Sequence, residues 1–344
     1  RIENILVKAD IIAKENNSNI ITKKDIDDIL YKEEDIENEY LDMYKDNKIF
    51  INTEGKVIGN INGLAVLDTG TYRFGKPLRI TCVAIKGSGE VIDIHKEAKL
   101  SGKIHEKSIK ILQSLLSSKI SKYNSLPIDL HLSFEQSYGM IEGDSASVAE
   151  MVVMLSAISK KGIKQNIAVT GSLNQFGEVQ PIGGVNEKIE GFFNVCKTVS
   201  SYKGKGVLIP DTNKDELILK PEIEDAVKKG DFHIYVMSNL EDAIETLILD
   251  DDENIEDFYS LIQDELKKYK DSYVGDNSAV INILSNLPLN TYVSELSLKT
   301  DRKPYEITVN YKENPALGLD DYNNFWKDKN PNEVLEKNAN WYEP

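Results

Sequence analysis

Residues 142–190 read EGDSASVAEMVVMLSAISKKGIKQNIAVTGSLNQFGEVQPIGGVNEKIE, and the rest of the sequence is organised around this stretch. It contains two glycine-marked turns, and a helical pattern follows each of them. The first turn carries Ser145 and leads into a run that is apolar nearly all round, which is typical of a buried helix. The second helix begins after Gly183 and Gly184 and carries Lys188 about one turn from its start. The pattern predicts a candidate nucleophile and a candidate base at the starts of two helices.

Ser145 and Lys188 are chemically matched, because a serine hydroxyl needs a neighbour that takes its proton and a neutral lysine amine can do so. The lysine pKa of about 10.4 must first fall. The positive end of the helix dipole and apolar neighbours such as Ile189 both lower it. Unpaired amides around Gly143 to Ser145 could also stabilise an oxyanion. Each residue alone also has a plainer interpretation, Ser145 as a helix N-cap and Lys188 as a solvated helix lysine.

Three strings around these residues resemble the proteolytic domain of the Lon proteases. The strings are FEQSYGMIEGDSASVAE (134–150), AVTGSLNQFGEVQPIGGVNEKIEGFF (168–193) and GVLIP (206–210). The spacing from Ser145 to Lys188 is 43 residues (188 − 145). The sequence is more similar to the LonB branch of the family, in which an aspartate, here Asp144, precedes the serine. The similarity runs from about Asn60 to about Leu249.

The resemblance implies a Ser-Lys dyad formed by Ser145 and Lys188, with Thr170 hydrogen-bonded to the lysine. It implies an α+β fold of the ribosomal protein S5 domain 2-like type and a serine endopeptidase that hydrolyses unfolded or damaged proteins. It also implies a cytoplasmic hexameric ring that receives its substrates from an AAA+ ATPase module. That module binds ATP and Mg and is absent from this chain. We therefore expect no cofactor in this chain itself. The alternative is a catalytically silent binding or assembly module of the same fold.

Asp144 and Thr170 each have two interpretations. A carboxylate beside the nucleophile could pair with Lys188, raise its pKa and keep it charged. We therefore expect that Asp144 or Glu142 can hold Lys188 in a resting state, with Asp144 as a simple helix cap as the alternative. The alternative for Thr170 is a threonine that only forms a turn.

The sequence divides into three segments by composition. Residues 1–47 have helical periodicity, Thr22 and Asp25 indicate a helix cap, and the segment resembles the end of an AAA+ lid or is a plain helical linker. Residues 48–250 form the expected proteolytic domain. Its first part, residues 48–94, reads as an antiparallel β unit whose first strand is KIFIN (48–52).

Residues 251–344 form an acidic extension that resembles nothing in the Lon family. Its first part, residues 251–271, reads as an amphipathic helix, and later parts resemble strands. The interpretations are a solvated tail or a docking element that uses aromatic residues such as Trp326 and Trp341.

Three other motifs point to different chemistry and are rejected. Residues 70–77 read GTYRFGKP and match a phosphate-binding loop, but Pro77 stands where a hydroxyl is required and a strand pattern follows. His131 could act as a base for Ser145, but the surrounding strings resemble a dyad family. Residues 200–203 match S-x-x-K without the partner motifs of penicillin-binding enzymes.

Composition limits the partners. A net charge of −16 argues against a nucleic-acid surface, which needs a basic footprint. No stretch has the roughly 20 apolar residues of a membrane span, and the four histidines form no close metal-ligand pair, so we expect neither a membrane segment nor a metal site. Cys82 and Cys196 in apolar settings favour a reduced, cytoplasmic protein. We also expect that Arg1 lies inside a longer polypeptide.

Overall fold

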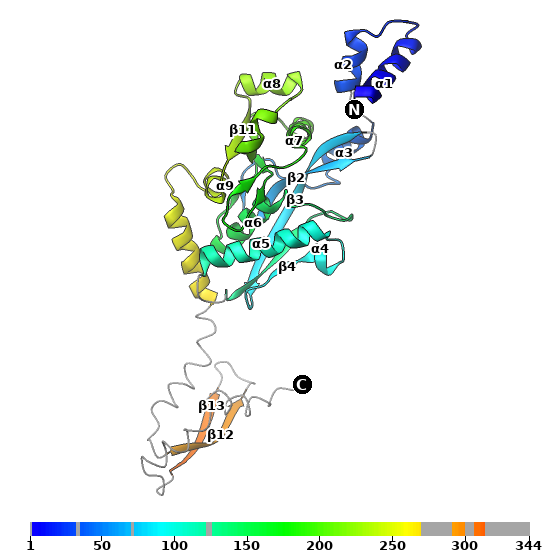
Figure 1. Ribbon diagram of the computed structural model, residues 1–344. Coiled ribbons are helices and arrows are strands. Elements are labelled where there is room, and N and C mark those ends of the chain that lie inside the picture. The colour runs from blue at the N-terminus through cyan, green and yellow to red at the C-terminus, as the bar shows by residue number, and fades with distance from the viewer. Residues whose placement is uncertain are drawn as a thin grey trace. The chain divides into compact units, whose positions relative to one another are not determined.

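A computed structural model describes residues 2–31, 35–69, 72–121, 126–269, 291–299 and 306–313 (Figure 1). The chain divides into two compact units, Arg1–Tyr269 and Lys270–Pro344. In the second unit, β12 (Thr291–Lys299) and β13 (Glu306–Glu313) pair as an antiparallel ribbon. This confirms strand material in the extension, whereas Trp326 and Trp341 lie outside the described residues.

The first unit begins with three helices, α1 (Ile2–Glu15), α2 (Lys23–Tyr31) and α3 (Asp35–Lys45). The predicted cap before α2 is present, because the Thr22 backbone N–H donates to Asp25 Oδ2 at 2.7 Å. Helix α3 is attached to the sheet and to α7. Tyr44 donates its hydroxyl to the Pro77 carbonyl at 2.7 Å, and the Asn194 amide donates to Glu37 at 2.9 Å.

The described residues of the first unit contain a seven-stranded sheet in the order β11-β10-β7-β2-β3-β5-β4. The bounds of its strands in chain order are β2 (Asn60–Asp68), β3 (Arg73–Lys86), β4 (Val91–Asp93), β5 (Ile128–Phe134), β7 (Ile167–Val169), β10 (Lys205–Pro210) and β11 (Phe232–Met237). Small two-stranded ribbons are β1 (Lys56–Val57) with β6 (Ile163–Lys164), and β8 (Ser172–Leu173) with β9 (Val179–Gln180).

The antiparallel pairing expected within residues 48–94 is confirmed for β2 and β3 and is wrong for β4, and the whole sheet is mixed. Strands β2, β3 and β5 are antiparallel neighbours, but β4 runs parallel to β5, and β2, β7, β10 and β11 are parallel. The reason is the connection between β4 and β5, which contains helices and returns the chain before it pairs. The predicted strand at residues 48–52 is wrong, because that stretch is a loop bonded to the Gln136 side chain. The fold is therefore mixed α/β.

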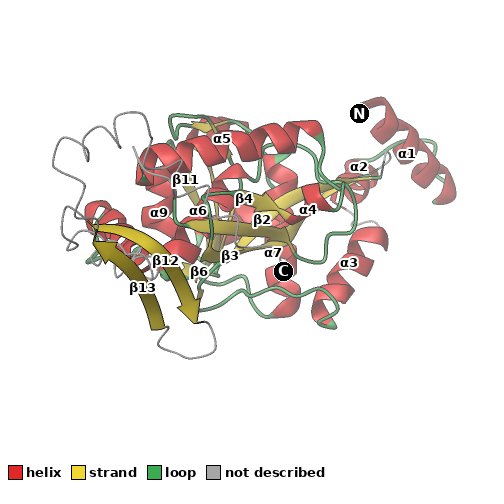
Figure 2. Cartoon of the chain, turned by 90° about the horizontal axis from the view of Figure 1, so that it is seen from below, coloured by secondary structure: helices red, strands yellow, loops and turns green. Residues whose placement is uncertain are grey.

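Helices cover both faces of the sheet (Figure 2). Their bounds are α4 (Ile94–Glu97), α5 (Lys103–Ile120), α6 (Ser147–Ser159), α7 (Val185–Val199), α8 (Pro221–Lys228) and α9 (Leu240–Leu247). Helices α5, α6 and α9 contribute to one hydrophobic cluster, whereas α7 and α8 contribute to a second one. None of the described helices has the length and apolar composition that a membrane crossing requires.

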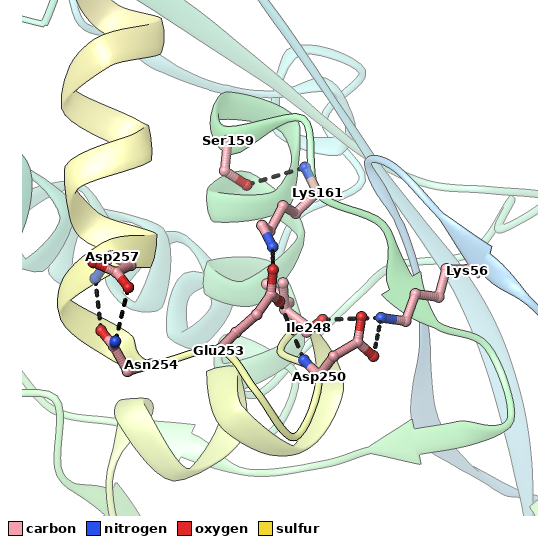
Figure 3. A network of polar contacts seen from close by, with 8 residues as sticks. All are labelled: Lys56, Ser159, Lys161, Ile248, Asp250, Glu253, Asn254 and Asp257. Carbon is pink, nitrogen blue, oxygen red and sulfur yellow. Dashed lines mark hydrogen bonds and ion pairs between the residues drawn. The ribbon is translucent and has the colours of Figure 1, made fainter.

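The predicted amphipathic helix after α9 is present over residues 255–269 and belongs to the first unit. Phe258, Ile262 and Leu266 bury its apolar face in the first hydrophobic cluster. Polar contacts secure the segment that leads into it (Figure 3). Lys56 pairs with Asp250 at 2.6 Å, and Lys161 pairs with Glu253.

Helix α7 lies directly on β3, and two glycines allow this approach. A Cβ atom on Gly75 would overlap the Glu187 carbonyl oxygen, and one on Gly191 would overlap the Gly75 carbonyl oxygen. Within the string 70–77, β3 begins at Arg73, which agrees with the predicted strand. Gly75 in this string packs against α7. Because Glu187 precedes Lys188, the same contact fixes the position of the lysine.

Gly191→Ala tests this contact. Alanine favours a helix over glycine by about 1 kcal/mol, so the substitution would be stabilising if α7 had room for a methyl group. We expect instead a loss of about 1–3 kcal/mol in the free energy of unfolding in urea, because the helix must move away from β3. Gly183→Ala is the matched control, since no atom lies within 4 Å of its Cβ position. An unchanged or raised stability of Gly191→Ala would contradict the proposed contact.

Candidate active site

The turn that precedes α6 presents Ser145. Gly143 has a φ of +95°, which favours glycine, and Ser147 closes the turn by donating its N–H to the Asp144 carbonyl at 3.0 Å. The N-cap residue of α6 is Ala146, without a side-chain cap bond. The N-cap interpretation of Ser145 is therefore wrong, and its hydroxyl is available to another partner.

Lys188 is that partner. It lies in the first turn of α7, after Gly184 with a φ of +70°, and is only 3% exposed. Its Nζ donates to Ser145 Oγ at 2.9 Å and to Thr170 Oγ1 at 2.9 Å. The interpretation of Lys188 as a solvated lysine is therefore wrong.

Burial lowers the pKa of Lys188 to about 8, because an ammonium loses its hydration in this site. The negative charges of Asp144 and Glu187 oppose this change without cancelling it. With such a pKa, about a tenth of the molecules carry a neutral amine at pH 7. The site can therefore supply a base near neutral pH, which an ordinary lysine cannot.

Thr170 connects the two residues from the end of β7. It is fully buried, its N–H donates to the Leu208 carbonyl, and its hydroxyl donates to the Ser145 carbonyl at 3.1 Å. The hydroxyl oxygen of Thr170 also accepts the bond from Lys188 Nζ. The Gly171 N–H also donates to the Ser145 carbonyl at 2.9 Å. Thr170 therefore does more than form a turn, because it contacts both members of the pair.

The two expected acidic residues lie in different places. Asp144 accepts a bond from the Ser172 hydroxyl at 2.9 Å, and no ion pair joins it to Lys188 in the described part of the chain. Its side chain does not cap α6. Glu142 accepts from the Ile104 N–H at 3.1 Å at the start of α5. In this structure, the carboxylates of Asp144 and Glu142 are thus hydrogen-bonded to groups other than Lys188.

Backbone amides of the serine turn are available beside the serine hydroxyl. Among the described residues, no acceptor is bonded to the N–H groups of residues 143–146, whereas the next two amides donate to the Asp144 and Gly171 carbonyls. The start of a helix favours negative charge. The sequence predicted amides around Gly143 to Ser145, and these N–H groups are among the ones without an acceptor. It missed Ala146 and Ser172, because the path of the turn is not visible in a residue pattern.

Two of the three rejected motifs, His131 and residues 200–203, lie away from the Ser145 pair. His131 is on β5, paired with Val83 of β3, and the described residues show no bond from it to Ser145. In the stretch 200–203, the Ser201 hydroxyl accepts the Lys203 N–H, and the Lys203 side chain pairs with Asp231. Neither motif meets the Ser145 pair.

Family models match two parts of the chain. Residues 34–250 match the Lon protease (S16) C-terminal proteolytic domain, and residues 266–341 match a domain of unknown function (DUF4825). The first match covers the sheet, the serine turn and α7. The second covers most of the acidic extension.

Several curated proteins are similar to this chain. A putative Lon protease homolog of Haemophilus influenzae is 41% identical over 246 residues, which are 69% of this chain and 41% of that protein. A putative Lon protease homolog of Escherichia coli is 43% identical over 203 residues, 58% of this chain and 35% of that protein. The archaeal Lon protease of Archaeoglobus fulgidus is 32% identical over 222 residues, 63% and 32% of the two chains. The chain thus spans less than half the length of these relatives.

Burial of Lys188 should reduce stability, and Lys188→Met tests this. Because its folded pKa of about 8 lies below the unfolded value of about 10.4, the charged amine destabilises the fold below pH 8. This cost disappears as the pH rises through the unfolded pKa. We expect the variant to gain about 1–3 kcal/mol in the free energy of unfolding at pH 7, and less at pH 10.

Lys197→Met is the control for this measurement. Lys197 lies on the same helix, is half-exposed and pairs with Glu222 at 2.6 Å, so the change should stay within about 0.5 kcal/mol. A Lys188→Met variant that is less stable than the unmodified chain at pH 7, or whose gain does not depend on pH, would contradict a costly buried ammonium.

Proposed function

The chain belongs to the Lon protease family through its proteolytic domain, and we propose that it is a serine endopeptidase with Ser145 and Lys188 as its dyad. The observation that carries the proposal is the 2.9 Å bond between Lys188 Nζ and Ser145 Oγ in a buried site that lowers the lysine pKa. The relatives of the LonB-like type, the archaeal Lon proteases, support the same branch.

In the proposed reaction, Ser145 Oγ bonds to the carbonyl carbon of the peptide, and its proton passes to neutral Lys188. The Ser145 and Ala146 N–H groups donate to the oxyanion. The carbon–nitrogen bond then breaks, and the Lys188 ammonium gives its proton to the leaving amine. Lys188 next takes a proton from the water that attacks the acyl-enzyme. The ester bond to Ser145 Oγ then breaks, and the Lys188 ammonium returns the proton to this oxygen, which restores the starting state. Thr170 holds the lysine amine and the serine turn in position through its two hydrogen bonds.

We extend the proposal to the whole protein by family likeness. The substrates would be unfolded polypeptides, the assembly a homo-hexameric ring in the cytoplasm, and the fold of the ribosomal protein S5 domain 2-like type. ATP and Mg would bind to an AAA+ module outside this chain. The described part of the stretch 70–77 leads into and starts β3, so this stretch does not supply the loop-to-helix cradle of a phosphate-binding loop.

A fluorophosphonate probe tests the proposal directly, because it reacts only with an activated serine. We expect stoichiometric labelling at Ser145, located by mass spectrometry of the digested chain, and none in Ser145→Ala. Ser147→Ala, two residues further on, should still be labelled at Ser145. Labelling that persists in Ser145→Ala would refute the dyad, and no labelling of the folded chain would favour the catalytically silent binding module.

The pH dependence of peptide cleavage tests the role of Lys188 and its neighbour Asp144. Only the neutral amine accepts a proton, so kcat/KM should rise with pH through a midpoint of about 8. The charge of Asp144 raises the lysine pKa, so Asp144→Asn should move this midpoint to lower pH. An unchanged midpoint and rate in Asp144→Asn would rule out any hold of this carboxylate on Lys188.

A further inference from the structure

Three buried ionisable side chains lie behind the serine turn, and the proposed reaction uses none of them. Asp93 ends β4, His105 lies in the first turn of α5, and Glu150 lies in the first turn of α6. Each is at most 2% exposed, and the Glu150 side chain is completely covered. We call Asp93, His105 and Glu150 the buried cluster.

His105 joins the two carboxylates of the buried cluster. Its Nε2 lies 3.3 Å from Asp93 Oδ2, and its Nδ1 lies 3.5 Å from Glu150 Oε1. Asp93 is also secured by the Ser101 hydroxyl at 2.6 Å and the His95 N–H at 3.0 Å. Glu150, in contrast, has no hydrogen-bond donor on either oxygen in the described part of the chain. The ion-pair contact with His105 is therefore its main support.

The buried cluster and the serine turn share their attachments. The Glu150 N–H donates to the Ala146 carbonyl at 2.9 Å, one helical turn from the amides proposed for the oxyanion. The residues just before His105 hold the entry to the serine turn, because Gly102 and Ile141 form a backbone bond of 2.8 Å and Glu142 accepts from Ile104. A displacement of the buried cluster would therefore move Ser145 through two connections, the start of α6 and the segment of residues 141–142.

The charges that act on Glu150 are unequal. His105 of α5 favours its ionised form, while Asp93 at the end of β4 and Asp144 of the serine turn oppose ionisation, as does burial. Burial and these two carboxylates raise the pKa of Glu150 to about 7. Contact with Asp93 and the charges of Glu150 and Glu142 raise the pKa of His105, in spite of its burial.

We propose that the buried cluster is a positioning unit for the serine turn, and that a single proton on Glu150 determines whether negative charge lies behind the oxyanion amides. This inference rests on the proposed peptidase function. With Glu150 protonated, the Asp93 and His105 charges balance and the start of α6 keeps its positive potential. With Glu150 ionised, a buried negative charge opposes the charge that develops on the substrate oxygen.

Glu150→Gln mimics the protonated state permanently, because the amide has the shape of the neutral acid. We expect its kcat to lie within about twofold of the unmodified chain at pH 6 and to exceed it on the order of tenfold above pH 8. The limb that belongs to Lys188 should remain, whereas the added ionisation near pH 7 should vanish. His105→Gln should move that ionisation to higher pH, since it removes the cation that favours ionised Glu150.

His95→Gln is the matched control for His105→Gln. Both imidazoles are buried and lie edge-on to Phe134 at 5.5 Å, but the ring of His95 contacts the Ser137 carbonyl instead of a carboxylate. Its loss should lower stability without moving the ionisation near pH 7. A merely structural role for the buried cluster predicts that both histidine variants lose stability and neither changes the pH profile.

Thermal unfolding supplies a readout that needs no activity. The folded pKa of Glu150 lies above the unfolded value of about 4.3, so its contribution to stability is complete below that value and is lost as the pH rises to about 7. The Tm of the unmodified chain minus that of Glu150→Gln should therefore fall between about pH 4.3 and pH 7. If Glu150→Gln does not fold, the infrared carbonyl band of a buried carboxylic acid in the unmodified chain should disappear across the same pH 7 midpoint.

The outcomes separate this inference from the proposed function. An unmodified chain that is inactive and unlabelled would overturn both the peptidase and the role of the buried cluster in it. An active chain whose Glu150→Gln variant keeps the original pH profile would overturn this inference alone. A flat Tm difference, or no carboxylic acid band at pH 6, would overturn it as well.

Discussion

The burial of Lys188 beside Ser145 is the constraint on which the rest of the site depends. A lysine amine is useful as a base only when its ammonium is destabilised, and here the fold achieves this by covering the side chain almost completely. Two separate hydrophobic clusters cooperate, because α6 belongs to one and α7 to the other. Thr170, at the end of β7 between them, receives the lysine and donates to the serine backbone. Ser145 and Lys188 therefore lie between the two hydrophobic clusters.

The same arrangement explains why polar groups gather around an apolar core at this point. The charges of Asp144 and Glu187 limit the fall of the lysine pKa, and the Ser172 hydroxyl donates a hydrogen bond to the Asp144 carboxylate. Behind the turn, the Asp93–His105–Glu150 cluster introduces a second balance of charge within one helical turn of the oxyanion amides. Asp93, His105 and Glu150 are buried ionisable groups, and such groups cost free energy that well-packed apolar residues would not. Their presence is what a reaction site requires.

Sequence reasoning reached the parts of this account that are local. Long strings mark Ser145, Lys188 and Thr170, and periodicity indicated the helices within residues 1–47 and the helix of residues 255–269. It could not give the parallel pairing of β4 with β5, because pairing depends on how a connection returns. Nor could it show that Gly75 and Gly191 meet, since the residues are far apart in the chain. Glu150 was hidden for a related reason, because its partners come from β4 and α5.

The pKa of Lys188 in the folded chain tests the central claim most directly. Lysine labelled with ¹³C at the ε carbon reports the charge of each amine by NMR, and a Lys188→Arg variant assigns the signal. The account predicts a midpoint of about 8, well below the value of about 10.4 of an ordinary lysine. A Lys188 signal that titrates at or above about 10.4 would contradict it, because the amine would then be an ordinary ammonium at neutral pH.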